Sequence, residues 1–302
     1  MKKTMLSWLL LLACNLMWSL QFTCIKLMQD QAGPFFTVWG PMLIATLLLG
    51  PFALNHFNRN KKSIKDVLVF VQLALLGVFP AQVFMTWGTQ YSTASNAAIL
   101  TLSLPVVTAF FAYLLIKEQM TTMRWASFSI AIIGVILCST SDIKNIDFGA
   151  KYAAGNLLIF LAIVGNSYYN VGCKKILSKY TEIEMVFFTY AAMVILLAPL
   201  VFYFEPGVFG RIPSFTKQTW MAIGLLTIFH NFLSMVLFFM ALKTLDAMQV
   251  ALSNYLITFF ALPIAAIWLG ETLSLKTMAG GILIFASTLT ITIVEYRMNR
   301  NI

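Results

Sequence analysis

The stretch that decides the fold runs from Ala94 to Glu118 and reads ASNAAILTLSLPVVTAFFAYLLIKE. A second stretch of the same length, from Ala247 to Glu271, reads AMQVALSNYLITFFALPIAAIWLGE and again opens with alanine and closes with glutamate. Each is long and apolar enough to cross a bilayer as one helix, which takes about 20 residues. Each is followed by a short polar step and a further apolar run. The recurrence indicates an internal duplication.

The composition predicts an all-α integral membrane protein. The chain has 302 residues, of which 60% are hydrophobic and 10% are charged, and its mean hydropathy is +0.85. A soluble domain carries about 25% charged residues. The alternating pattern of a transmembrane β-barrel, over about ten residues per strand, does not occur. The expected surroundings are therefore membrane lipid.

The net charge of +9 does not indicate nucleic acid, because the basic residues form short clusters between apolar runs. Clusters in that position set membrane topology. The cysteines Cys14, Cys24, Cys138 and Cys173 lie in or at the ends of apolar runs without ligand spacing, so we expect neither a metal nor a cofactor. The first apolar run continues past Cys14, which is too long for a cleaved signal core.

Ten transmembrane helices are predicted, at about 6–28, 35–55, 66–88, 94–116, 123–141, 153–173, 184–204, 218–242, 247–269 and 276–296. With a cytoplasmic amino terminus, inside loops would hold 14 of the 20 basic residues. The positive-inside rule therefore favours an inner-membrane protein with both termini in the cytoplasm.

The repeat extends to the start of each half, because residues 17–26 align with residues 165–174. The predicted units are residues 1–141 and 142–302, with five helices each. An odd number of helices reverses the orientation of the second copy, so the units form an inverted repeat. Such carriers bind substrate near the midplane, between the halves.

The chain resembles the EamA-like branch of the drug/metabolite transporter superfamily. The resemblance rests on the two tandem units, on Trp18-Ser19, on Pro105, and on the closing glutamates Glu118 and Glu271. It implies export or uptake of small metabolites, amino acids among them, through a cavity lined by helices 1–4 and 6–9. We therefore predict a secondary carrier, an exporter rather than an enzyme, that works by alternating access as a monomer or homodimer on a small-molecule substrate.

The helix expected at 218–242 carries a polar stripe of Thr227, His230, Asn231 and Ser234 at helical spacing. His230 is the one ionisable side chain near the middle of a predicted span. With an ordinary pKa of about 6.5, it could take up a proton during transport or donate to a substrate carboxylate. The alternative is a neutral histidine packed against a neighbouring helix.

Similar stripes on the other helices complete a predicted substrate site that mixes amides with aromatic rings. Its members are Trp18, Phe22, Gln82, Thr101, Asn166, Tyr169, Asn170, His230, Asn231 and Asn254. For any one of them, an interhelical hydrogen bond is an equally good explanation. The mixture suits amino acids, nucleobase-like metabolites and aromatic cations alike.

Residues at the helix ends have simpler interpretations. Glu118 and Glu271 are expected to be helix caps or interhelical ties. Lys26 and Lys174 could attract substrate carboxylates, or extend to the headgroups as lysines at helix ends do. Pro105 is expected to bend its helix.

Two other classes of function fit the sequence less well. An intramembrane enzyme would need a nucleophile with a base, paired acids or a metal cluster, and the sequence has neither GxSxG nor HExxH. A receptor without transport activity would not predict duplication around a polar centre. No residue is therefore assigned a catalytic role.

Overall fold

The computed structural model describes residues 2–57, 64–116, 146–174, 176, 179–243 and 253–273, with parts of 122–134 and 275–290. Within this part of the chain, every regular element is a helix. The spans expected at 123–141 and 276–296 fall largely outside it, as does the start of the span expected at 247–269.

The first half begins with α1 (Lys2–Met28) and α2 (Pro34–Phe57). The third span is one continuous rod made of α3 (Ile64–Leu73), η1 (Ala74–Val78), η2 (Pro80–Phe84) and α4 (Met85–Tyr91). The fourth span consists of α5 (Ala94–Leu100), η3 (Thr101–Ser103) and α6 (Leu104–Ile116). These bounds agree with the four spans expected from the sequence.

The second half begins with α8 (Ile146–Lys174), which starts earlier than the expected residue 153, and α9 (Glu182–Phe204). A short connection follows through α10 (Val208–Arg211) and η4 (Ile212–Ser214). The next span consists of α11 (Lys217–Leu225), η5 (Leu226–Leu233) and α12 (Ser234–Leu242), and α14 covers Tyr255–Leu269.

Six segments of the described residues are long and apolar enough to cross a membrane: Met5–Met28, Pro34–Ala53, Lys65–Tyr91, Ala94–Leu115, Glu182–Phe204 and Lys217–Leu242. Large apolar side chains on the outside of the bundle are open to the surroundings, such as Ile195 at 73% and Ile267 at 79% exposure. A surface of this kind is stable in lipid and not in water, so the helical bundle is an integral membrane protein.

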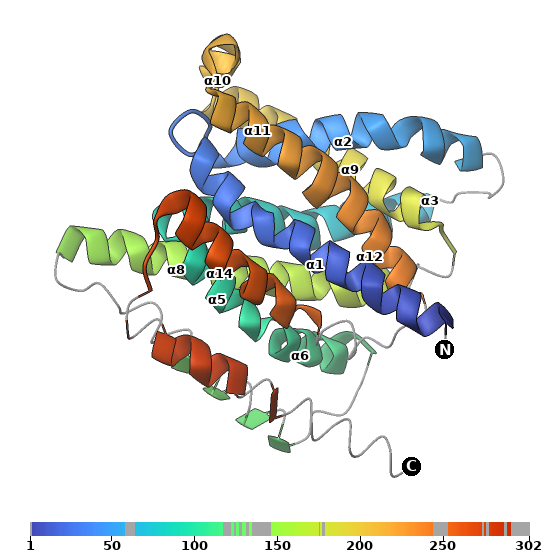
Figure 1. Cartoon of the computed structure of the whole chain (residues 1–302). Helices are drawn as coiled ribbons and strands as arrows, with labels where there is room; N and C mark the ends of the chain where they lie inside the picture. The colour runs from blue at the N-terminus through green and yellow to red at the C-terminus, as the bar shows by residue number, and fades with distance from the viewer. Residues whose placement is uncertain are drawn as a thin grey trace.

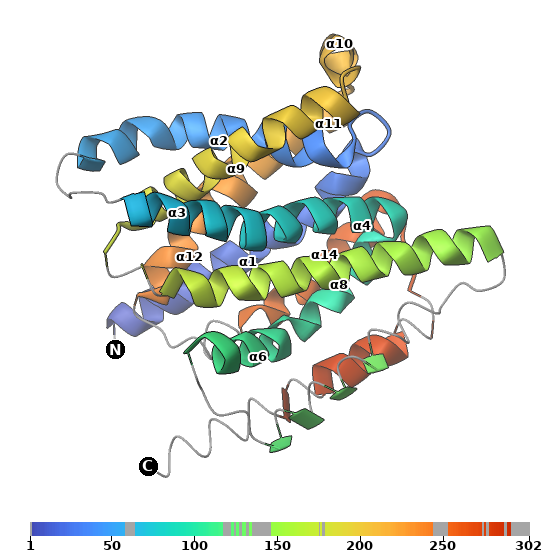
Figure 2. The same cartoon turned by 180° about the vertical axis from the view of Figure 1, so that it is seen from behind.

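The rods run side by side (Figures 1 and 2), and α8 lies along the third span. Glycine allows this close approach. A Cβ atom on Gly88 would lie 2.5 Å from the carbonyl oxygen of Gly155, and one on Gly155 would lie 2.8 Å from that of Gly88. Small residues at such crossings let two backbones touch, which supplies packing where lipid provides no hydrophobic driving force.

The helical rods depart from α-helical geometry near residues that lack a backbone N–H donor or that carry a hydroxyl able to donate to a backbone carbonyl. The π-helical η2 begins at Pro80, which has no N–H. A 3₁₀ turn, η3, ends at Ser103, two residues before Pro105. There the carbonyl of Ala98 accepts hydrogen bonds from the hydroxyls of Thr101 (2.6 Å) and Thr258 (2.7 Å). The helix thus departs from α-helical geometry shortly before Pro105, and the bend expected there stays a prediction.

One end of the bundle, which we call the capped end, comprises residues 26–36, 90–96, 205–219 and 271. Here the Glu271 carboxylate accepts from the backbone N–H groups of Ala94 (2.9 Å) and Ser95 (2.8 Å). Glu205 likewise accepts from Phe35 and Phe36, both at 2.9 Å. Each carboxylate caps the start of a helix distant in sequence, so Glu271 is the interhelical tie expected of it. Glu118 lies outside the described residues.

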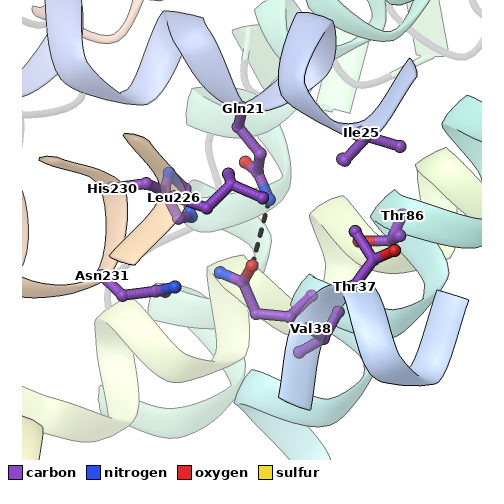
Figure 3. Close-up of a pocket in the computed structure, with 9 residues that line it drawn as sticks. Gln21, Ile25, Thr37, Val38, Thr86, Leu226, His230 and Asn231 are labelled. Atoms are coloured by element: carbon purple, nitrogen blue, oxygen red, sulfur yellow. Dashed lines mark hydrogen bonds between the residues drawn. The ribbon is translucent and has the colours of Figure 1, made fainter. Parts of the chain in front are cut away.

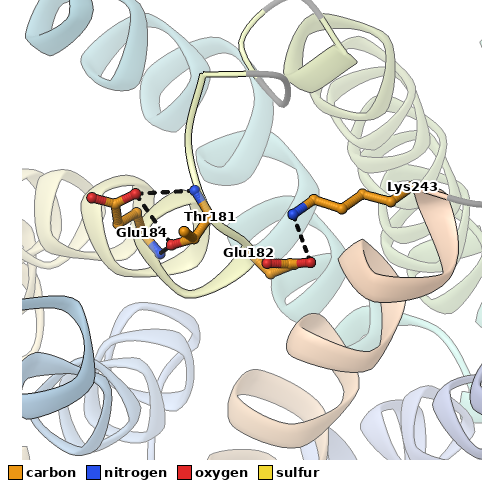
Figure 4. Close-up of polar contacts among 4 residues, drawn as sticks. All are labelled: Thr181, Glu182, Glu184 and Lys243. Carbon is orange, nitrogen blue, oxygen red and sulfur yellow. Dashed lines mark hydrogen bonds and ion pairs between the residues drawn. The ribbon is translucent and has the colours of Figure 1, made fainter. Parts of the chain in front are cut away.

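The opposite end, which we call the ion-pair end, comprises residues 64–66, 179–184 and 242–243. Two ion pairs join its helices, Lys179 with Asp66 (2.5 Å) and Lys243 with Glu182 (2.7 Å). Thr181 and Glu184 form a capping box at the start of α9 (Figure 4). The cavity described next lies between these two ends.

Candidate functional site

A central cavity of about 80 Å³ lies among both halves of the chain. Of the eight spans whose bounds are given above, all except α2 contribute to its wall. The lining residues are Trp18, Gln21, Phe22, Val78, Ala81, Gln82, Met85, Thr101, Leu104, Asn166, Tyr169, Asn170, Tyr190, His230, Met235, Phe238, Asn254 and Ile257. A cavity shared by so many helices changes shape when any of them moves.

The cavity brings together nine of the ten residues predicted for the site: Trp18, Phe22, Gln82, Thr101, Asn166, Tyr169, Asn170, His230 and Asn254. The tenth, Asn231, lines a smaller adjoining cavity instead. Its Oδ1 lies 3.4 Å from the Tyr190 hydroxyl, which donates to it. Whether any of these side chains contacts substrate stays a prediction.

The wall of the cavity is neutral. None of its described lining residues is aspartate, glutamate, lysine or arginine. The polar groups are amides, hydroxyls and one imidazole, and the apolar part includes several aromatic rings. Trp18 and Phe238 pack against each other there, with ring centroids 5.1 Å apart. Such a wall offers hydrogen bonds and π faces without a fixed charge.

Three buried polar atoms on residues of the wall lack a hydrogen-bond partner within the described part of the chain. They are the Tyr169 hydroxyl, Nδ1 of His230 and Oδ1 of Asn254, on side chains that are 4%, 6% and 8% exposed. A buried polar group without a partner costs about 1–3 kcal/mol. These three atoms are therefore available to a polar ligand or to water.

The smaller adjoining cavity, of about 10 Å³, shares Gln21, Gln82 and His230 with the central one. Its other lining residues are Ile25, Thr37, Val38, Thr86, Leu226 and Asn231. Gln21 Nε2 donates to Gln82 Oε1 at 3.0 Å, the contact dashed in Figure 3. This amide pair, together with His230, separates the two cavities.

The backbone departs from α-helical geometry where two of these three residues sit. Gln82 belongs to the π-helical η2, and His230 belongs to the π-helical η5. π-Helical turns are rare, and they occur frequently at functional sites. A π-helical turn rotates the side chains that follow it relative to an uninterrupted helix.

Sequence reasoning missed Gln21, Tyr190 and Phe238. Gln21 follows Trp18 by three residues, so helical spacing already placed it on the same face of α1. Tyr190 and Phe238 stand in strongly apolar surroundings on α9 and α12, where no pattern distinguishes a cavity ring from a packed one.

Lys26 and Lys174 were expected either to attract substrate carboxylates or to extend to the headgroups. Lys26 Nζ donates to the backbone oxygen of Gln90 at 3.3 Å and to Gln29 Oε1 at 3.2 Å. It therefore ties α1 to the end of α4 at the capped end, which neither expectation anticipated. The side chain of Lys174 lies outside the described residues.

The EamA-like transporter family matches this chain twice, over residues 5–140 and 153–293. The chain belongs to this family. As a member, it is a multi-pass membrane protein related to transporters, as the resemblance of its sequence predicted.

Curated relatives align over most of their length. A probable terminal-alkyne amino-acid exporter of Streptantibioticus cattleyicolor is 24% identical over 96% of this chain and 94% of its own. An uncharacterized transporter of Archaeoglobus fulgidus is 27% identical over 96% and 98%. An S-adenosylmethionine/S-adenosylhomocysteine transporter of Chlamydia trachomatis is 22% identical over 84% and 79%. These relatives are named for transport rather than for catalysis.

A solved crystal structure superposes on 98% of this chain and 98% of its own, with a TM-score of 0.65 and 17% sequence identity. At that identity, the likeness establishes the fold alone.

Proposed function

We propose that the chain is a secondary carrier that exports a small, net-neutral metabolite, an amino acid in the first instance, across the inner membrane. The two halves, 1–141 and 142–302, are inverted five-helix units that rock about the central cavity. Both termini are cytoplasmic, which places the capped end outside. The family, the named relatives and the 14-to-6 distribution of basic residues support this proposal.

The observation that carries the substrate class is the neutral wall of the cavity. Burying an ion without a compensating partner is costly. A net-charged solute would therefore lose more hydration free energy on entering the cavity than its contacts with the neutral wall supply. A zwitterion has no net charge, and its two poles can each find partners here. The amide N–H groups of Asn166 and Asn170 suit a carboxylate, whereas Oδ1 of Asn254 and the Trp18 ring suit an ammonium group.

The size of the cavity supports a small solute. Pockets for drug-sized ligands measure about 300–1,000 Å³, and this cavity measures about 80 Å³. An amino acid therefore enters only as the surrounding helices separate, which is what a rocking mechanism supplies. Export as the direction rests on the name of the exporter relative.

The test is transport by purified protein in proteoliposomes. A panel of labelled metabolites, with and without a pH gradient, identifies what moves and whether protons are coupled to it. Glutamine, glutamate and lysine then compare solutes of similar size and different charge. We expect exchange of glutamine to exceed that of either charged solute by tenfold or more.

A matched pair of variants checks whether the cavity decides this preference. Asn166→Asp places a negative charge in the wall and is expected to favour lysine over glutamine. Gln218→Glu adds the same charge at the exposed start of α11, at the capped end, and is expected to change nothing. Equal transport of all three solutes by the wild type would contradict the neutral-substrate proposal. Failure to transport any metabolite of the panel would contradict the proposed carrier function.

A further inference from the structure

One serine lies directly after the π-helical turn that carries His230. Ser234 is fully buried, and it is the first residue of α12. In an α-helix, its backbone N–H would donate to the carbonyl four residues back, which belongs to His230. Here that N–H donates to the carbonyl of Phe229, five residues back. The wide turn has therefore withdrawn the usual donor from the His230 carbonyl.

The side chain of Ser234 replaces the withdrawn donor. Its hydroxyl donates to the His230 carbonyl, so this one residue supplies a hydrogen bond to each of the two carbonyls at the end of the turn. A buried carbonyl that loses its donor is unfavourable. The hydroxyl therefore stabilises the π-helical geometry of η5.

Other buried hydroxyls of the bundle make a bond of the same spacing without a π-helical turn. Thr46 donates to the Met42 carbonyl at 2.7 Å in α2, and Thr189 donates to the Met185 carbonyl at 2.8 Å in α9. Both threonines lie in α-helical segments, where such a hydroxyl supplements the backbone hydrogen bonds. The spacing alone therefore does not create a wide turn. In η5, by contrast, the hydroxyl of Ser234 takes over a bond that the turn has removed.

A second contact fixes Ser234 against α1. The Cys14 thiol donates to the Ser234 carbonyl, with Sγ and the oxygen 3.3 Å apart. Cys14 is also fully buried, and it lies about one helical turn before Trp18, which lines the central cavity. Ser234 thus connects α1, through its carbonyl, to the turn that carries His230.

The geometry of the turn decides where the His230 imidazole lies. His230 lines both cavities, whereas Asn231 lines the smaller one alone (Figure 3). Without the hydroxyl, the Ser234 N–H can return to the His230 carbonyl, and the turn then relaxes to α-helical geometry. A change of one residue in register rotates a helix by about 100°. Such a rotation turns the imidazole away from its present place on the wall.

We infer that Ser234 is a positioning residue of the candidate site. Its hydroxyl holds the π-helical turn and thereby keeps the His230 imidazole, with its unpartnered Nδ1, on the wall that the two cavities share. Ser234 is not among the residues that line either cavity, so it acts on a solute only through His230. The effect on transport rests on the proposed carrier function, whereas the effect on the imidazole does not.

The first measurement observes the imidazole directly. The chain has two histidines, His56 and His230, so in a His56→Gln background the NMR signals of labelled histidine report His230 alone. Ser234→Ala should move these signals, because it removes the hydroxyl and lets the turn relax. Ser234→Thr keeps the hydroxyl and should retain the wild-type signals. Ser234→Cys, whose thiol is a weaker donor, should give signals between those of the wild type and the alanine variant.

Thr46→Val is the matched control. It removes a buried hydroxyl with a bond of the same spacing from α2, which does not line the central cavity, and should leave the signals in place. A monodisperse elution profile in detergent should show that each variant is folded, and Ser234→Cys carries the test if Ser234→Ala does not fold. Unmoved signals in the folded variant, or equal movement in Thr46→Val, would overturn the inference.

The second measurement asks whether Ser234 acts through His230. In the proteoliposome assay, Ser234→Ala should raise the KM for glutamine about two- to tenfold, the effect of losing about one hydrogen bond, and should change kcat less. In His230→Ala protein, the same substitution should add nothing. A further rise in KM there would contradict the positioning role. Moved NMR signals in a protein that transports no glutamine would contradict the proposed function and leave the positioning of the imidazole standing.

Discussion

The capped end and the ion-pair end hold the same helices together by different chemistry. At the capped end, carboxylates and amides bond to backbone groups. Glu271 and Glu205 cap helices, and Gln31 Oε1 accepts from the Thr216 N–H at 2.8 Å and from the Thr219 hydroxyl at 2.6 Å. At the ion-pair end, two lysines that are 47% and 40% exposed contact carboxylates.

This contrast indicates which end of the bundle separates more easily. Ion pairs of exposed side chains contribute about 0–1 kcal/mol, because water and salt screen them. A helix cap contributes about 0.5–2 kcal/mol, and its loss leaves backbone donors unpaired. The capped end is therefore the firmer end in this structure. Four experiments test this contrast, in order of decreasing expected effect.

The largest effect is expected from Gly88→Ala, at the close crossing near the capped end. The new methyl group would meet the carbonyl oxygen of Gly155 at 2.5 Å, so the backbones of α4 and α8 must move apart. Overpacking of this kind costs about 1–3 kcal/mol. Gly172→Ala, near the ion-pair end, is the control, because its methyl group would meet only the flexible tip of Leu73. Thermal unfolding in detergent measures both, and equal losses would contradict the assignment of the crossing.

The next effect is expected from Glu271→Ala. The change leaves the N–H groups of Ala94 and Ser95 without their acceptor and should lower stability by about 0.5–2 kcal/mol. Glu271→Gln keeps one oxygen and should lose less. Hydrogen exchange at the start of α5 should accelerate in the alanine variant. Unaltered protection there would show that the carboxylate does not stabilise this helix.

A smaller effect is expected when both ion pairs are removed. The double variant Lys179→Met/Lys243→Met keeps the long apolar stems and deletes the charges, so its loss should stay within about 1 kcal/mol. The difference from wild type should shrink further in high salt. A loss larger than that of Glu271→Ala would reverse the ranking of the two ends.

The smallest effect concerns pH and Glu205, just beyond the end of α9. Burial raises the pKa of Glu205 above its ordinary value of 4.5, although the N–H groups of Phe35 and Phe36 oppose that rise. A carboxyl group with a raised folded-state pKa contributes stability below its unfolded-state pKa and loses it as pH rises through the folded-state pKa. The melting temperature of the wild type, relative to Glu205→Gln, should therefore rise as pH falls from 7 toward 4.5. A difference that falls over this range would mean that the cap depresses the pKa instead.

Much of the fold follows from the pattern of apolar residues along the sequence. Spanning length and hydropathy predicted the first four helices and the spans that start near Glu182 and Lys217, because a helix in lipid must satisfy its own backbone over a fixed thickness. The π-helical turn η5 was not predictable, since Leu226–Leu233 contains neither proline nor glycine. That distortion depends on the neighbouring helices.

Some features of the candidate site were likewise predictable from the sequence, and others were not. Helical spacing identified Trp18, Asn166 and His230, because polar groups in a span must face the interior. It gave no reason to separate Asn231 from His230, although the first lines the smaller cavity alone and the second lines both. The exact rotation of η5 decides that separation.

By itself, the sequence determined that this chain is a helical membrane protein of the EamA-like family with polar groups directed inward, because bilayer thickness and backbone satisfaction leave few alternatives. The tertiary structure alone decided which of those groups meet: Glu271 with the start of α5, and Gln21 with Gln82. These pairings span 177 and 61 residues of chain. Contacts between residues so far apart in the sequence depend on how the helices rotate and cross. The local sequence pattern does not specify this arrangement.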